Sequence, residues 1–320
     1  MIEPFAAPSG NPLDRAAHRR LDPSWLAEAW LRARIVILDA TSPFSGHALV
    51  DGAGDLVFVD ASHPSAAASE VSERFFLGED DEGTPYFGAL GSLPEVPGTR
   101  VVTMREVGAD LDARAGGILV TMIALANFHR RHVFSPETGL PLQIGEGGWS
   151  RIDANGRQAW PRTDPAVIVL VHDDVAGGDG RCLLGHNAAW KPQPGQARRY
   201  SCLAGFVEPG ESAEAAVERE VFEEVGVRVT DVRYAASQPW PYPGSLMLGF
   251  YALADPDAPL RLDPAEIAAA AWFTRAEIRA ALEAMADDTG STGPDVAPVE
   301  PGLPMASSIA YRLVRGWAYA

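Results

Sequence analysis

The sequence predicts an α+β fold, with a mixed β-sheet between helices in the second half and a smaller α+β domain before it. Three observations lead to this prediction. The chain has 320 residues, which is longer than one average domain. Residues 166–171 are a nearly continuous β-branched run, as expected of a strand covered on both faces. Strand-like and helical segments then alternate, the pattern of a sheet that packs between helices.

In the first half, an amphipathic helix is expected at Pro23–Arg32, and a second helix at Ile118–His132. Short strands are expected at residues 34–39, 55–60 and 74–77. Turn residues such as Asp51 and Gly52 separate these strands. No chemical motif stands out in this half, so we expect it to serve in packing or dimerisation.

The second half is expected to hold five strands and three helices. The strands are predicted at residues 166–171, 182–184, 200–203, 227–232 and 245–253. The helices are predicted at residues 212–225, 275–285 and 307–319. A stretch rich in Gly, Pro and Asp, residues 287–304, is predicted to form a loop.

Composition limits the class of protein. The formal net charge of −17 argues against a general basic surface for nucleic acid, although a bound metal can still supply local positive charge to a phosphorylated substrate. Cys182 and Cys202 are the two cysteines and both fall in strand-like stretches, which excludes a disulfide framework. Neither a membrane span nor a secretory signal is readable. We therefore expect a cytoplasmic protein.

The stretch with the clearest chemistry is Gly205–Val227, GFVEPGESAEAAVEREVFEEVGV. Ser212 is a suitable helix N-cap, and Gly226 is a suitable residue to end the helix. Three carboxylates on this helix, Glu220, Glu223 and Glu224, have the spacing i, i+3, i+4 and therefore share one face. Like charges so placed cost helix stability unless a cation neutralises them. Oxygen ligands alone favour a hard ion such as Mg²⁺ or Mn²⁺.

A solvated acidic helix face is the alternative interpretation. The number of fixed positions around the glutamates argues against it. Those positions are Gly205, Glu211, Arg219, Glu220, Val221, Glu223, Glu224, Gly226 and Val227. Together they resemble the signature box of the Nudix hydrolase superfamily.

This resemblance implies an α/β/α sandwich in which a loop-helix-loop holds divalent metals against a diphosphate. Glu220, Glu223 and Glu224 match the metal-binding glutamates of the family, and the carbonyl of Ala204 matches a backbone ligand. Glu211 and Arg219 resemble the pair that braces the loop. A metal-bound water would be the nucleophile, and Glu224 is a candidate for the residue that accepts its proton.

A second motif, Ser237–Ser245 or SQPWPYPGS, begins ten residues after the box. Its alternate prolines predict an extended, rigid loop with little entropy left to lose on binding. A proline-rich connection with a merely packed Trp is the alternative. The motif resembles the signature of the NADH/NAD pyrophosphatases, relatives of which also remove NAD caps from RNA. Substrate contacts are thereby implied for Gln238, Pro239, Trp240, Pro241, Tyr242, Pro243, Gly244 and Ser245.

The resemblance extends to five further residues. Glu266 matches an additional metal ligand, and Ala310 matches a backbone contact to the substrate. Trp160 and Phe206 match aromatics on either side of a nicotinamide ring, although Trp160 could instead be a core aromatic. Arg105 matches a substrate-contacting arginine of the first half.

The chain departs from the family at the zinc ribbon, which usually has two Cys-x-x-Cys pairs. The corresponding residues are Ser135, Thr138, Ile152 and Asn155. None provides a thiolate, so zinc is not expected. Turn residues at 135–139 and 153–156 suggest that the hairpins of the ribbon persist without metal. The expected division is an N-terminal domain at 1–128, a degenerate ribbon at 129–160 and a Nudix domain at 161–320.

The predicted reaction is metal-dependent hydrolysis of NADH or NAD⁺ to nicotinamide mononucleotide and AMP, with NAD-capped RNA as a further substrate. An RNA chain would need a local basic groove, such as Arg198–Arg199 or His129–Arg131. One alternative is a Nudix hydrolase for ADP-ribose or a dinucleoside polyphosphate. Another is a non-catalytic module that senses a nucleotide, although the box glutamates are all present. We expect a homodimer with no membrane partner.

Overall fold

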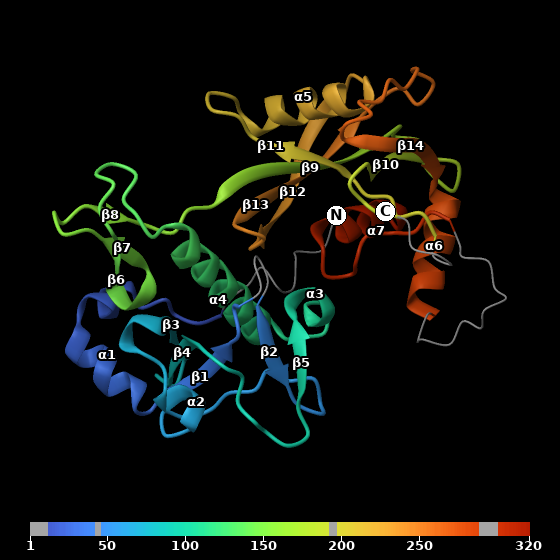
Figure 1. Ribbon diagram of the computed structural model, residues 1–320. Coiled ribbons are helices and arrows are strands. Elements are labelled where there is room, and N and C mark those ends of the chain that lie inside the picture. The colour runs from blue at the N-terminus through green and yellow to red at the C-terminus, as the bar shows by residue number, and fades with distance from the viewer. Residues whose placement is uncertain (1–11, 42–45, 192–196, 288–299) are drawn as a thin grey trace. The chain divides into compact units, whose positions relative to one another are not determined.

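The computed structural model describes residues 12–41, 46–191, 197–287 and 300–320 (Figure 1). They form two compact units. The N-terminal unit comprises the described residues up to Thr163 together with residues 239–245, and the C-terminal unit comprises the described residues 164–238 and those from 246 onward. Most of the loop predicted at 287–304 lies outside the described residues.

The N-terminal unit is built on a sheet of β1 (Arg34–Leu38), β4 (Pro85–Leu90) and β3 (Arg74–Glu79), in the order β1-β4-β3. β1 is parallel to β4, and β3 is antiparallel to it. β2 (His47–Val50) and β5 (Arg100–Thr103) form a separate antiparallel pair. Its helices are α1 (Pro23–Trp30), α2 (Pro64–Ala67), α3 (Met104–Val107) and α4 (Ala113–Arg131).

Alternate residues of β1 enter two separate cores, as the strand period of two requires. Val36 and Leu38 belong to the cluster that contains α4, whereas Ile35 and Ile37 belong to the cluster that contains Trp30 of α1. The sheet is therefore covered on both faces by helices of its own unit.

Two predictions for this unit need correction, and the strands β2, β4 and β5 are not expected from the sequence. Residues 55–60 do not form a strand, because Leu56 bridges to Val50 while Val59 bridges to Ile35, so no continuous ladder develops. The helix predicted from Ile118 begins earlier, at Ala113, because the Asp112 side chain accepts a hydrogen bond from the Ala115 N–H at 2.7 Å. A side-chain cap thus starts the helix before its apolar stripe begins.

The segment that resembles a degenerate ribbon forms a small antiparallel sheet of β6 (Gln143–Gly145), β7 (Ser150–Ile152) and β8 (Gln158–Ala159). Turns occur at both places where turn residues predict them. Thr138 Oγ1 donates to Asp153 Oδ2 at 2.6 Å, which links the two turns directly. This bond lowers the pKa of Asp153, with smaller contributions from backbone N–H donors.

The C-terminal unit contains a six-stranded sheet in the order β12-β13-β9-β10-β14, with β11 paired to β9. Its strands are β9 (Asp164–His172), β10 (Arg181–Asn187), β11 (Leu203–Phe206), β12 (Thr230–Trp240), β13 (Ser245–Leu253) and β14 (Ile267–Thr274). Its helices are α5 (Ala213–Val225), α6 (Arg275–Asp287) and α7 (Ile309–Ala318). Within this unit, α5 and α7 lie on opposite faces of the sheet (Figure 1). The predicted α+β fold with a mixed sheet is confirmed.

Three strand predictions in this unit need correction. The strand expected at 200–203 is β11, which begins only at Leu203, and the strand expected at 227–232 is β12, which runs from Thr230 to Trp240. The first part of the proline-rich motif is thus a strand end rather than a loop, and the turn occupies residues 241–244. β14 was not expected, because its sequence IAAAAWFT is rich in alanine, but pairing with β10 stabilises it.

Among the described residues, no helix combines the length and the apolar character that a membrane crossing requires.

Candidate active site

Helix α5 positions the box glutamates, and local signals set both of its ends. The Ser212 hydroxyl accepts a hydrogen bond from the Ala215 N–H at 3.2 Å, and Gly226 ends the helix with a φ of 75°. Val217 and Val221 are fully buried in the core against the sheet. This docking directs the adjacent stripe of glutamates toward β11, which contacts α5.

A network around Arg219 closes the glycine-rich turn onto α5. Its Nη2 donates to Glu211 Oε1 at 2.6 Å and to the Phe206 carbonyl at 2.8 Å. Glu211 also accepts from the Glu208 N–H at 2.8 Å. The hydrogen bond from Arg219 is the main cause that lowers the pKa of Glu211. One arginine therefore ties the residues on both sides of the turn to the helix.

The other terminal nitrogen of Arg219 serves the glutamates. Nη1 donates to Glu220 Oε1 and to Glu223 Oε2, both at 2.9 Å. With these two carboxylates held by the guanidinium, no three His, Cys, Asp or Glu side chains of the described residues converge tightly enough to hold an ion. Arg219 thus engages one oxygen of each carboxylate, Oε1 of Glu220 and Oε2 of Glu223.

Glu224 differs from the other two glutamates. It is 4% exposed, it accepts a hydrogen bond from the Ala204 N–H, and its Oε2 has no partner among the described residues. Burial, and then the charges of Glu220 and Glu266, raise its pKa to about 8. Burial also raises the pKa of Glu220. A buried carboxylate oxygen without a partner beside other carboxylates is the donor set that a hard divalent cation requires.

The backbone at Ala204 also fits this donor set. Ala204 pairs with Ile168 of β9, and the next ladder bond runs from the Val207 N–H to the Pro165 carbonyl. Because bonded and non-bonded pairs alternate in an antiparallel ladder, Ala204 turns both its N–H and its carbonyl away from β9. The carbonyl thus lies on the same side as the Glu224 carboxylate. A Cβ on the next residue, Gly205, would stand 1.9 Å from the Glu220 carboxyl carbon, so any larger residue here would displace that carboxylate.

Glu266, the other predicted metal ligand, is exposed at the start of β14. Its charge contributes to the raised pKa values of Glu220 and Glu224, so it lies within electrostatic reach of both. Its carbonyl accepts a hydrogen bond from the Ala188 N–H at 2.7 Å, at the end of β10. The four glutamates that are predicted to bind metal thus lie in one region of the C-terminal unit.

Gln238 lies at the end of β12 and is 1% exposed. Its Nε2 donates to the Ser307 carbonyl at 2.8 Å, and its Oε1 accepts from the Ile309 N–H at 2.6 Å. Both ends of the amide thus hold the beginning of α7. Ala310, one residue further on, is buried, and its carbonyl accepts from the Cys202 thiol at 3.8 Å.

The rest of the proline-rich motif, from Pro239 to Ser245, belongs to the N-terminal unit. The Trp240 and Tyr242 rings meet edge to face, with centroids 5.1 Å apart. The Arg105 guanidinium stands 5.4 Å from the first ring and 4.5 Å from the second. The structure therefore brings together Arg105 and the two aromatic residues of the motif, although more than a hundred residues separate them along the chain.

Asn127, for which the sequence predicts no role, fixes this segment. Its Nδ2 donates to the Pro241 carbonyl at 2.7 Å, and the residue is 2% exposed. Asn127 is a lone amide within the apolar stretch of α4. Because a buried amide needs a hydrogen-bond partner, this pattern could have indicated a contact with another segment.

Trp160 and Phe206 are both largely exposed, at 59% and 57%. A core position for Trp160 is therefore wrong. The two residues belong to different units, and their joint contact with a nicotinamide ring stays a prediction.

Comparisons with known proteins identify the family of the chain. Residues 162–292 match the family model for the NUDIX domain. The NAD-capped RNA hydrolase NudC of Mycobacterium bovis is 38% identical over 95% of this chain and 92% of that one. The human NAD-capped RNA hydrolase NUDT12 is 36% identical over 65% of this chain and 42% of that one.

Among solved structures, a NUDIX hydrolase from Nitrosomonas europaea aligns over 49% of this chain and 90% of that one, with 24% identity and a TM-score of 0.31. The family assignment comes from the sequence matches, because NudC aligns with nearly the whole chain. The chain belongs to the Nudix hydrolases and, among them, to the NAD pyrophosphatase family that includes the NAD-capped RNA hydrolases.

Proposed function

We propose that this enzyme hydrolyses the pyrophosphate bond of NADH and NAD⁺ to nicotinamide mononucleotide and AMP, and that it removes NAD caps from RNA. The observation that carries the proposal is the Glu224 carboxylate, buried beside Glu220 and Glu266 with one oxygen unpartnered. In a catalytic site such an oxygen can bind a cation, whereas in a helix with only a structural role it would be solvated or hydrogen-bonded. The names of the two relatives support the choice of substrate.

We assign the cofactor as Mg²⁺ or Mn²⁺. Its ligands would be Glu220, Glu223, Glu224, Glu266 and the Ala204 carbonyl. When bound, the cation would neutralise phosphoryl oxygens and lower the pKa of a coordinated water. Hard oxygen donors without a thiolate or an imidazole suit these ions, and zinc is not part of the proposal.

The residues of the chain would divide the remaining work. Glu224 would bind the cation through its unpartnered oxygen, Oε2, and its other carboxylate oxygen would accept the proton of the attacking water. Arg219 would keep the turn closed through Glu211 and Phe206. Glu223 is exposed and would be the glutamate that most readily leaves Arg219 for a ligand.

Substrate choice would rest on aromatic side chains. Trp240 and Tyr242, with Arg105 beside them, offer ring faces and a cation to a nucleotide. Trp160 and Phe206 are exposed and would be available to stack on a nicotinamide ring. Pro239, Pro241, Pro243, Gly244 and Ser245 would hold the segment in shape, and Gln238 and Ala310 would contribute through the beginning of α7.

Hydrolysis of ADP-ribose and pure nucleotide sensing are the alternatives. The experiment is to incubate the enzyme with NADH and ADP-ribose in parallel, with and without Mg²⁺ or Mn²⁺, in ¹⁸O-water. We expect cleavage of NADH only with metal, and one ¹⁸O in a single mononucleotide product, which identifies the phosphorus attacked. Preference for ADP-ribose, or binding without turnover, would overturn the proposal.

We also propose that two copies of the chain associate. Light scattering should then give about twice the chain mass of 34.1 kDa.

A further inference from the structure

A pocket of 830 Å³ in the C-terminal unit has no role in the chemistry described above. Its walls come from the end of β10 with the residues after it, from the residues before β11, and from β14. The side chains that define it are His186, Trp190, Lys191, Arg198, Tyr200 and Phe273. We call it the basic pocket.

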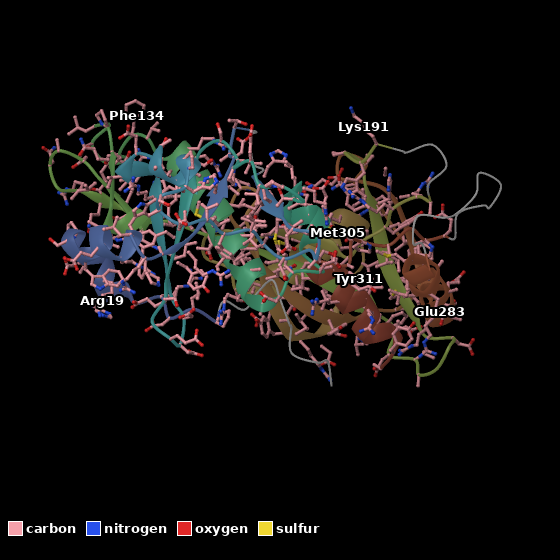
Figure 2. All side chains as sticks on the ribbon, turned by 90° about the horizontal axis from the view of Figure 1, so that it is seen from below. Arg19, Phe134, Lys191, Glu283, Met305 and Tyr311 are labelled. Carbon is pink, nitrogen blue, oxygen red and sulfur yellow. The ribbon has the colours of Figure 1, made fainter. Side chains whose placement is uncertain are left out.

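The basic pocket carries positive charge in a chain whose net charge is −17. Lys191, Arg198 and Arg199 line it, and Glu300 is the one acidic residue among its described walls. Glu300 Oε1 accepts from the Arg198 N–H at 2.9 Å, so it holds the backbone. Lys191 and Arg198 are both exposed, and Lys191 projects away from the ribbon (Figure 2). Two exposed cations are therefore available to an anionic ligand.

Aromatic rings alternate with these cations. The Arg199 guanidinium stacks 3.7 Å from the Trp190 ring, and His186 lies edge-on to Trp190 with ring centroids 5.7 Å apart. The Tyr200 and Phe273 rings, which also line the pocket, meet edge to face with centroids 5.0 Å apart. Bases of single-stranded nucleic acid stack on such rings while basic side chains follow the phosphates.

The basic pocket lies beside the candidate active site of its own unit. The Ala188 N–H donates to the carbonyl of Glu266, a proposed metal ligand. Trp190 follows two residues later, so its Cα lies within about 8 Å of that of Ala188. On the other wall, Tyr200 precedes Ala204 by four residues. Both walls of the pocket are thus continuous along the chain with segments that carry proposed metal ligands, Glu266 and Ala204.

The other basic run, His129–Arg131, is a weaker candidate. His129 is 5% exposed and its Nε2 is bonded to the Gly148 carbonyl at 2.7 Å. Burial lowers its pKa to about 4, so it remains neutral near pH 7. It supplies no cation to a phosphate.

We propose that the basic pocket binds the single-stranded RNA that follows a 5′ nicotinamide nucleotide, with Lys191 and Arg198 on phosphates and Trp190 against a base. This inference rests on the proposed function for its substrate. It assigns a binding surface for the polynucleotide portion, which NADH lacks. The pocket should therefore matter for capped RNA and not for the free dinucleotide.

The test compares wild type, the double variant Lys191→Ala/Arg198→Ala and the matched control Arg157→Ala/Arg233→Ala. The control removes two exposed arginines, each of which pairs with an acidic side chain away from the pocket. Both double variants therefore lose two positive charges. Each protein is assayed for kcat/KM with NADH and with a short unstructured NAD-capped RNA. We expect the pocket variant to lose at least about fivefold on RNA through KM, to keep NADH turnover, and to reduce the salt slope of binding by about 1.4.

Binding of a 5′-phosphorylated RNA by fluorescence anisotropy provides a readout that needs no turnover. Weaker binding by the pocket variant than by the control supports the inference, even if wild type fails to cleave NADH and the proposed function is lost. Equal RNA binding and equal RNA turnover in both double variants would overturn it. So would a wild type that cleaves NADH and leaves capped RNA intact.

Discussion

Arg219 and Glu211, eight residues apart, are joined by a 2.6 Å hydrogen bond that closes the glycine-rich turn onto α5. The two sides of this guanidinium have separate tasks. Nη2 and Nε hold Glu211, while Nη1 bridges Glu220 and Glu223. A cation could therefore take the two glutamates from Nη1 while the bonds to Glu211 keep the turn closed. This geometry explains why an arginine, with its fork of donors, stands at this position.

The first prediction concerns the glutamates. Glu223→Gln and Glu224→Gln should each lower kcat/KM for NADH by about 100-fold or more, because each removes a ligand charge or the proposed base. Without metal, stability should hold or rise slightly, since like charges on one helix stripe repel each other. Steady-state kinetics and thermal unfolding in EDTA measure the two effects.

Glu218→Gln is the matched control for these variants. Glu218 is exposed on the same helix and belongs to no site contact described above. It should retain near wild-type turnover. Full activity in Glu223→Gln and Glu224→Gln would disprove the roles assigned to those residues.

The second prediction concerns specificity. Trp240→Ala should reduce NADH turnover far more than turnover of a simpler diphosphate ester, because the ring shared with Arg105 and Tyr242 is lost. The ratio of the two kcat/KM values is the measurement, and it cancels any general loss of folded enzyme. An unchanged ratio would mean that the Trp240 ring is only structural.

The third prediction concerns metal content. Elemental analysis after dialysis should find zinc well below one per chain, because Thr138 and Asp153 join the two turns by a direct hydrogen bond and the ribbon positions carry no thiolate. EDTA should stop catalysis, and Mg²⁺ or Mn²⁺ should restore it. Circular dichroism should remain unchanged throughout. One zinc per chain, or unfolding by EDTA, would contradict this interpretation of the ribbon.

The fourth prediction concerns pH. Burial lowers the pKa of His129 from 6.5 to about 4, so its contribution to stability is present above pH 6.5 and is lost as the pH falls toward 4. His129→Gln keeps a donor for the Gly148 carbonyl and removes the titration. Between pH 7.5 and pH 5, wild type should lose about 2 kcal/mol more unfolding free energy than the variant. Urea unfolding at both values measures this, and equal losses would show that the His129 ring is already solvated.

Local spacing in the sequence is enough to predict α5 and its chemistry. Ser212, Gly226 and the three glutamates act through helix geometry that repeats every 3.6 residues, so their shared face follows without tertiary information. The sequence also predicts β13 at its observed bounds, Ser245–Leu253, because this short apolar run follows the turn residues of the proline-rich motif.

Tertiary structure alone decided the rest. β14 is a strand because β10 supplies its hydrogen bonds, although its alanines have little intrinsic preference for one. Asn127 and Arg105 meet the proline-rich segment only after α3 and α4 have packed into the N-terminal unit. Contacts of this kind join residues far apart in sequence, and their partners depend on how sheets and helices pack, which no local period records.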